Sequence, residues 1–385
     1  MTDSKTADAA SASDTNPLLR TDALPEFAAI RPEHVEPAVR RTLAEQRDAL
    51  ARAESVETPG IEWLQDLERV HDTVQRVWGP VSHLNSVVST PAMRDAYNAA
   101  LPLITEFSTE LGQNETLYRR FVELEQRLPP ELTVERELVA QTLRDFRLGG
   151  VALTGDARER FRDVMQSLAA HQATFEQNLM DATDAFEHHE TDPAALAGLP
   201  DFVLERARAA AEEKGRDGWL LALDPPTYMA VMTHAESPDL RSLYYEAWVT
   251  RASDKGPSAG RWDNGPLMTK ILALRLEAAR LLGFDTYAEL SLATKMADSP
   301  AEVIEFLEDL ARRSRTHAER DLEELTAQAG RRLDPWDVAY YSERLKQHRF
   351  DLSEEELRPY FPLPKVLGGL FELAERLFGI VIAPA

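Results

Sequence analysis

The sequence predicts a mainly α-helical protein with a small antiparallel β ribbon. Three observations support this fold class. Apolar residues recur at helical spacing through most of the 385 residues, helix-start signals recur along the chain, and two short stretches have the character of strands.

Residues 1–15 have the composition of a disordered tail. The opening stretch MTDSKTADAASASDTN consists mainly of small and polar residues and lacks the apolar segment of a signal peptide. No apolar run in the chain approaches the roughly 20 residues that a membrane span needs. We therefore expect a disordered tail over 1–15 and neither a leader nor an anchor.

Turn signals divide the remainder of the chain into three parts. LGG and LTGD mark a turn near residue 150, and two consecutive prolines stand at 225 and 226. The sequence therefore predicts an N-terminal helical domain over 16–150, a connecting region over 151–224 with a long helix and the β ribbon, and a further unit over 225–385.

The clearest helix covers 156–186, where one apolar stripe runs over about eight turns. The stripe consists of Phe161, Val164, Leu168, Phe175, Leu179, Ala182 and Phe186. Further helices are expected to begin at Thr90-Pro91, at SPAE (299–302) and at DPWD (334–337), each of which supplies a capping side chain before a proline.

Two stretches are expected to be strands. AFEHHET (185–191) and GWLLALDPPTY (218–228), the second closed by Pro225 and Pro226, are predicted to form the antiparallel ribbon around a helix over 200–214. Near the C-terminus, a helix-like run over 366–378 gives way at Gly379 to the apolar residues 380–382. Chain ends are usually polar, so we expect this chain to end inside a domain.

Composition excludes several function classes. The net charge of −23 disfavours nucleic acid and anionic membrane surfaces as partners. The absence of cysteine excludes disulfides, thiolate metal sites and a cysteine nucleophile, and it fits a reducing compartment. We therefore expect a cytoplasmic protein.

One stretch matches the pattern of a serine nucleophile. GPSAG (256–260) has the G-x-S-x-G spacing of the α/β-hydrolase elbow, which would make Ser258 the nucleophile. That chemistry needs a strand before the serine and a helix directly after it, whereas the preceding residues have helical character. A plain Gly/Pro/Ser loop is the preferred interpretation.

The histidines do not form a recognisable zinc motif. No two stand four residues apart, and position 193, where a second histidine of H-E-x-x-H would follow His189, is Pro193. If 185–191 is a strand, His188 and Glu190 share one face while His189 points away. His171 lies on the long apolar stripe, where a core or rim histidine is expected. By residue chemistry alone we assign no catalytic, cofactor-binding or metal-binding residue.

Several longer stretches resemble the oligopeptidase A branch of the thimet-oligopeptidase family of zinc metallopeptidases. They are NPLL (16–19), LPEFAAIRPEHVEPAVRRTL (24–43), GPVSHLNSV (79–87), RASDKGPSAGRWDN (251–264), ALRLEAARLLGFDTYAELSLATKMA (273–297) and WDVAYYSERLKQHRFDLSEEELRPYFP (336–362). Their order and spacing extend the resemblance from Asn16 to about Ile380.

The resemblance implies a helical lobe of a two-lobed, clam-like zinc peptidase whose channel admits short peptides. Catalysis in that family uses H-E-x-x-H and a downstream Glu on zinc, and this sequence stops before that motif. The C-terminal catalytic part is therefore missing, and 225–385 would be the incomplete start of the peptidase domain. Zinc is expected for the complete family member, with no ligand in this chain. Trp336, Tyr340 and Tyr341 would line the channel or, as we expect, belong to the core.

Two functions remain open at this point. The first is the N-terminal portion of a zinc oligopeptidase that hydrolyses short cytoplasmic peptides, such as degradation products and cleaved signal peptides. This chain would be inactive alone and would need its missing C-terminal catalytic half as a partner. The alternative is a truncated, non-enzymatic helical module that binds peptides or serves as a scaffold.

Overall fold

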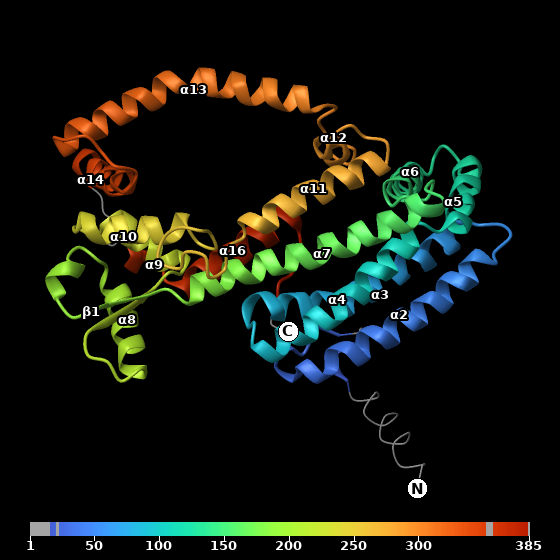
Figure 1. The fold of residues 1–385 in the computed structure, drawn as a ribbon, viewed down its shortest axis with the longest axis horizontal. Helices are drawn as coiled ribbons and strands as arrows, with labels where there is room; N and C mark the ends of the chain where they lie inside the picture. The colour runs from blue at the N-terminus through green and yellow to red at the C-terminus, as the bar shows by residue number, and fades with distance from the viewer. Residues whose placement is uncertain (1–15, 21–22, 352–356, 384–385) are drawn as a thin grey trace, which may run out of the picture. The chain divides into compact units, whose positions relative to one another are not determined.

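The computed structural model describes residues 16–20, 23–351 and 357–383 (Figure 1). The predicted disordered tail over 1–15 lies outside these residues. Within them the chain is mainly α-helical and has a two-stranded antiparallel sheet, as predicted. No described helix is both long and apolar enough to cross a bilayer.

The chain separates into two compact units. Unit 1 comprises residues 1–178 and 263–306, and unit 2 comprises residues 179–262 and 307–385. The domain boundaries expected from the sequence, at 150 and 225, stay a prediction.

Unit 1 is built from α-helices. They are α2 (Pro32–Glu54), α3 (Ile61–Val87), α4 (Pro91–Gly112), α5 (Glu115–Arg127), α6 (Thr133–Leu148), most of α7 (Gly155–Asp184), α11 (Gly265–Leu281), α12 (Tyr287–Leu292) and the start of α13 (Pro300–Ala329).

Unit 2 holds both strands and the other α-helices of the described residues. They are the end of α7, β1 (Glu187–Glu190), α8 (Asp201–Glu213), β2 (Trp219–Ala222), α9 (Pro225–His234), α10 (Pro238–Val249), the rest of α13, α14 (Val338–Phe350) and α16 (Leu363–Phe378).

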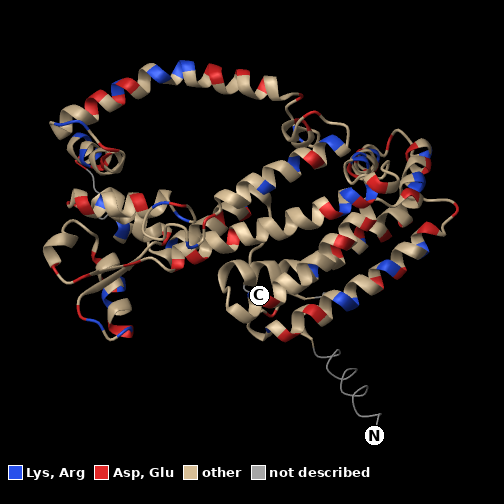
Figure 2. Cartoon of the chain, in the orientation of Figure 1, with Lys and Arg blue, Asp and Glu red and all other residues tan. Residues whose placement is uncertain are grey.

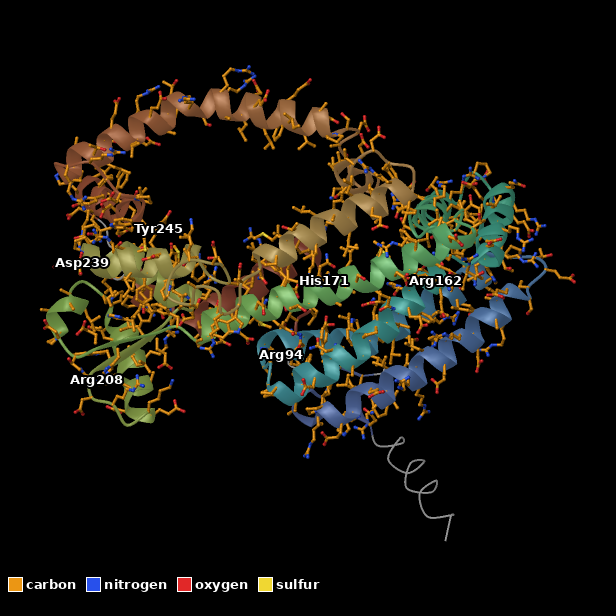
Figure 3. The ribbon with its side chains drawn as sticks, viewed as in Figure 1. Arg94, Arg162, His171, Arg208, Asp239 and Tyr245 are labelled. Atoms are coloured by element: carbon orange, nitrogen blue, oxygen red, sulfur yellow. The ribbon has the colours of Figure 1, made fainter. Side chains whose placement is uncertain are left out.

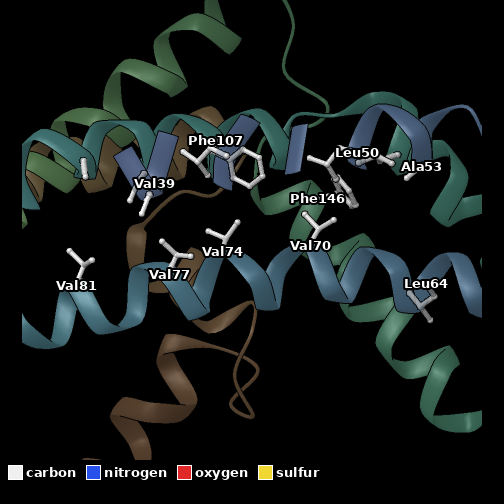
Figure 4. Close-up of a cluster of buried hydrophobic side chains, with 14 of the residues drawn as sticks. Val39, Leu50, Ala53, Leu64, Val70, Val74, Val77, Val81, Phe107 and Phe146 are labelled. Atoms are coloured by element: carbon white, nitrogen blue, oxygen red, sulfur yellow. The ribbon is translucent and has the colours of Figure 1, made fainter. Parts of the chain in front are cut away.

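The larger core of unit 1 lies among α2 to α6. Valines at helical spacing on α3 point toward buried side chains such as Val39 and Phe107 (Figure 4). These valines are Val70, Val74, Val77 and Val81. Burial of one face of each amphipathic helix is what holds such a bundle together.

A second core of unit 1 joins α7 to α11, which run side by side (Figure 1). Phe161, Val164 and Leu168 from the predicted stripe pack against Ile271 and Ala278. The observed helix, Gly155–Asp184, therefore confirms both the predicted element and its apolar face.

The buried side chain of Gln113 anchors the end of α4 to α7. Its Oε1 accepts hydrogen bonds from Arg162 Nε at 2.7 Å and Arg158 Nε at 3.3 Å. Arg162 lies on α7 in Figure 3. Because this amide is fully buried, these contacts satisfy a group that would otherwise be costly to bury.

Two glycines bring the ends of α4 and α6 into backbone contact. A Cβ atom added to Gly149 would lie 2.8 Å from the Cα of Gly112 and 3.0 Å from its carbonyl oxygen. Because 2.8 Å is shorter than Cβ atoms adopt, a side chain at 149 requires the backbone to move.

The predicted helix starts are present where the structure describes them. Thr90 accepts a hydrogen bond from the N–H of Met93, and Ser299 accepts one from the N–H of Glu302. The DPWD stretch begins a short 3₁₀ helix that leads into α14.

The second predicted strand is present and ends before the two prolines that were expected to close it, but the residues from these prolines onward form a helix. The strand β2 ends at Ala222, and Pro225–Tyr228 form the first turn of α9. Asp224 caps this helix by accepting a hydrogen bond from the N–H of Thr227 at 3.0 Å. A proline is favoured at the first helical position, because its missing N–H is not needed there.

Two helices expose large apolar side chains. On α16 these include Val366, Leu370 and Leu377. On α13, charged residues of both signs recur along the helix (Figure 2), yet Ile304 and Leu322 are exposed as well.

Candidate functional site

The residues singled out by the sequence gather mainly in unit 2, beside the β ribbon. The strands β1 and β2 pair antiparallel, with His188 opposite Leu221 and Glu190 opposite Trp219. The alternation of β1 places His188 and Glu190 on its more buried face, while His189 lies on the exposed face. This arrangement confirms the predicted division of the three side chains.

His188 sits in an apolar environment. Its ring is 6.3 Å from that of Tyr244, which is fully buried, and its Nε2 lies 3.8 Å from Glu190 Oε2. Burial lowers the pKa of His188 below its ordinary value, although the charge of Glu190 opposes this effect. A neutral imidazole at pH 7 follows from this environment.

The carboxylate of Glu190 is hydrogen-bonded to the backbone of the turn that follows β1. It accepts hydrogen bonds from the N–H groups of Asp192 and Thr191, each at 2.8 Å. These two bonds, in that order, lower the pKa of Glu190. His189 is also engaged, because its Nε2 lies 2.7 Å from the carbonyl oxygen of Asp217.

A cavity of about 390 Å³ adjoins His188. Its wall includes Ser258 and the neighbouring Arg261 and Trp262, whose side chains stack with the guanidinium carbon 4.1 Å from the ring centre. Ser258 lies in a series of turns that follows the helix α10, not a strand. The structure therefore lacks the strand–turn–helix setting of a nucleophile elbow at Ser258.

The aromatic residues near position 340 lie in two environments: some pack against the hydrophobic core, and others pack against a buried ion pair. Trp336 packs against the core of unit 2 and lies 5.9 Å from the ring of Tyr245. The guanidinium carbon of Arg241 lies 4.3 Å from the ring centre of Tyr340. The ring centres of Tyr340 and Tyr341 are 5.2 Å apart. The core role expected of Trp336 is confirmed, whereas a place for these residues in a peptide channel stays a prediction.

A buried ion pair lies next to these aromatic residues. Arg241 of α10 donates from Nη2 to Asp337 Oδ1 at 2.6 Å, and both side chains are almost wholly excluded from solvent. Asp337 also accepts from Arg331 Nη2 at 2.8 Å and from the N–H of Asp334 at 3.1 Å.

The pKa of Asp337 reflects this setting. Burial acts to raise it, but the hydrogen bonds from Arg241 and the Asp334 backbone and the charge of Arg331 together lower it. Sequence reasoning did not find this pair. Its members stand 96 positions apart, and the only local signal at Asp337 was its place in a helix-start motif.

The described residues do not fit a zinc site. No group of three or more His, Asp or Glu side chains within the described part of the chain is arranged to hold a metal ion. His188 and Glu190 provide two potential ligands, and the carboxylate is already occupied by backbone N–H groups. His171 is half-buried on α7 in unit 1, in a different unit from these residues (Figure 3).

Comparison with known proteins gives matches along nearly the whole chain. Residues 231–385 match the model of peptidase family M3, and residues 39–158 match that of the neurolysin/thimet oligopeptidase N-terminal domain. Oligopeptidase A from Salmonella typhimurium is 45% identical over 376 residues, which cover 95% of this chain and 55% of the relative.

Other relatives give the same result. Oligopeptidase A from Escherichia coli is 44% identical over the same shares of each chain. The probable cytosolic oligopeptidase A from Arabidopsis thaliana is 37% identical over 96% of this chain and 54% of its own length. The chain thus spans about half the length of the curated relatives it matches. It belongs to peptidase family M3, in the branch that contains thimet oligopeptidase and oligopeptidase A.

Proposed function

We propose that this chain is the N-terminal portion of a zinc-dependent oligopeptidase that hydrolyses short peptides. The observation that carries the proposal is 45% identity to an oligopeptidase A over 95% of the chain. Substrates of this class include degradation products and cleaved signal peptides, and the acidic surface suits neither nucleic acid nor anionic membranes. We place the protein in the cytoplasm.

We further propose that this chain by itself hydrolyses no peptide. Its sequence has no H-E-x-x-H motif. In zinc peptidases the metal polarises the scissile carbonyl and lowers the pKa of its bound water. Because the described residues fit no such metal, none of them receives a catalytic role, and the chain contributes one lobe and one wall of the peptide channel.

A chimera tests the proposal directly. The 385 residues would be joined to the segment of Salmonella typhimurium oligopeptidase A that follows the matched region. We expect the chimera to hydrolyse a quenched fluorescent oligopeptide in a chelator-sensitive manner, and the chain alone to show no turnover above a mock preparation. Turnover by the chain alone, or a well-folded but inactive chimera, would contradict the proposal.

The alternative function is a non-enzymatic helical module that binds peptides or a protein partner. The nucleotide sequence beyond codon 385 separates the two functions. An H-E-x-x-H motif encoded downstream, in frame or after a frameshift, supports the oligopeptidase. A stop codon followed by unrelated sequence favours the module.

A further inference from the structure

Unit 1 contains a cavity of about 610 Å³, larger than the cavity beside His188. Residues of α4, α7, α11 and α12 contribute to its wall, and Figure 1 shows the last three of these helices next to one another. Its volume lies within the range of roughly 300–1,000 Å³ that is typical of small-molecule sites.

The charge of the cavity is opposite to that of the protein. The chain has 66 acidic and 43 basic residues, yet the described residues that line this cavity include Arg275 and Lys295 and no Asp or Glu. Neither cation forms an ion pair with a described carboxylate. The carboxylate of Glu277, two residues from Arg275, is held by Arg160 at 2.6 Å.

Both cations are positioned but not neutralised. The guanidinium carbon of Arg275 lies 5.0 Å from the ring centre of Tyr287, and its Nε is buried without a hydrogen-bond partner among the described residues. Lys295 Nζ donates to the hydroxyl of Ser291 at 2.5 Å. Buried donors normally have partners, so the Nε of Arg275 indicates a site that an acceptor from a ligand would complete.

The other residues of the wall indicate the chemical character of the rest of such a ligand. Phe161, Met165 and Leu168 present apolar surface from α7, and Gln172 and Thr294 add neutral polar groups. A guanidinium matches a carboxylate in geometry as well as in charge. An apolar molecule that carries a carboxylate at one end would therefore satisfy both the cations and the apolar wall.

We propose that this cavity binds a carboxylate attached to an apolar body, the first candidate being the free C-terminus of a short peptide with an apolar last residue. The inference that the cavity binds a carboxylate depends on the cavity alone. The inference that this carboxylate belongs to a peptide depends on the proposed function. The site would hold a peptide end and is separate from any hydrolysis.

The test measures binding to the full chain by isothermal titration calorimetry, without zinc. The probes are acetyl-Ala-Leu-Phe with a free carboxylate, the same peptide as its C-terminal amide, and octanoate. We expect the free acid to bind at least tenfold more tightly than the amide. Octanoate binding at the same site would support the carboxylate chemistry and assign a non-peptide source.

Variants locate the site. Arg275→Met and Lys295→Met each remove one charge from the wall while retaining an apolar side chain, and each should weaken binding of the free acid at least tenfold. Arg280→Met is the matched control, because Arg280 is an exposed arginine of the same helix that does not line the cavity. Melting temperatures verify that the variants are folded. Ala169→Phe fills the cavity without removing charge, so it should also weaken binding of the free acid.

Several results would overturn the inference. They are equal affinity for acid and amide, no binding of either carboxylate probe at millimolar concentration, and an Arg280→Met effect as large as that of Arg275→Met. Since no turnover is measured, failure of this test leaves the chimera experiment intact. An inactive chimera would likewise not affect the binding result.

Discussion

We expect Asp337→Ala to lower the free energy of unfolding of unit 2 by about 3–5 kcal/mol, because it leaves a buried arginine charge without its partner. The structure supports a value in this range. Arg241 is 2% exposed and would retain only the carbonyl oxygens of Ala235 and Glu236, at 2.6 and 3.1 Å. The ring of Tyr340 covers the guanidinium and would slow the entry of replacement water.

Two further variants show which part of the effect comes from the buried charge. Arg331→Ala removes the other arginine of Asp337, but this arginine is 43% exposed and its charge is screened by solvent, so we expect a much smaller loss than for Asp337→Ala. The double variant Arg241→Met with Asp337→Leu removes both buried charges, and it should recover most of the stability lost in Asp337→Ala.

Urea unfolding at pH 7 followed by tryptophan fluorescence is a suitable assay. Unit 2 holds four of the six tryptophans, which are Trp219, Trp248, Trp262 and Trp336. For a unit of this size a loss of 3–5 kcal/mol corresponds to a fall in Tm of roughly 6–20 °C. A loss below about 1 kcal/mol in Asp337→Ala, or a double variant less stable than Asp337→Ala, would refute the argument.

The sign of the pH dependence follows from the lowered pKa of Asp337. A carboxylate whose pKa is lower in the folded state stabilises the fold above its unfolded pKa of about 3.9. That stabilisation is present at pH 7 and disappears as the pH falls below 4 and through the folded pKa. Asp337→Ala should therefore remove part of the acid sensitivity of unit 2, which the same urea series at pH 3–5 measures.

The remaining predictions concern other parts of the chain. Because burial lowers the pKa of His188, the stability of unit 2 should decrease as the pH falls below about 6.5. In thermal melts recorded from pH 7.5 to 5, His188→Gln should make this decrease in Tm smaller. Because α16 exposes apolar side chains, the chain should self-associate at micromolar concentration; Leu370→Glu with Leu377→Glu should reduce the mass measured by light scattering, and a monomeric parent chain would contradict this. Micromolar zinc should leave Tm unchanged, whereas a zinc site would add about 2.7 kcal/mol of stability at a free zinc concentration of a hundred times its Kd. A rise in Tm that a chelator reverses would contradict this and point first to His188 and Glu190. Ser258→Ala should leave any residual hydrolysis unchanged in a fluorescent peptide assay.

Sequence reasoning was most successful where the signal is local. The long helix over 156–186, the cap at Thr90 and the alternation of β1 depend on neighbours within a few residues, so they can be recognised without knowledge of the fold. Sequence reasoning used the prolines at 225 and 226 only as the end of a strand, although Asp224 before them is a capping residue and the pair also begins a helix.

The sites, by contrast, depend on distant parts of the chain. The pair of Arg241 and Asp337 and the cavity that contains Arg275 and Lys295 each combine elements whose proximity no spacing rule predicts. In a chain with 66 acidic residues, a single carboxylate such as Asp337 has no distinguishing feature until its burial is known.

The contact between Gly112 and Gly149 has a consequence for how this family can vary. A side chain at 149 is opposed chiefly by the backbone of Gly112, 2.8 Å from the added Cβ atom, and one at 112 would lie 3.1 Å from the Cα of Gly149. The two sites are therefore epistatic: alanine at 149 is harmful while α4 keeps its place and becomes acceptable after a shift of that helix. In related sequences we expect replacements at the two positions to occur together with changes in the loop that follows each helix, and not singly.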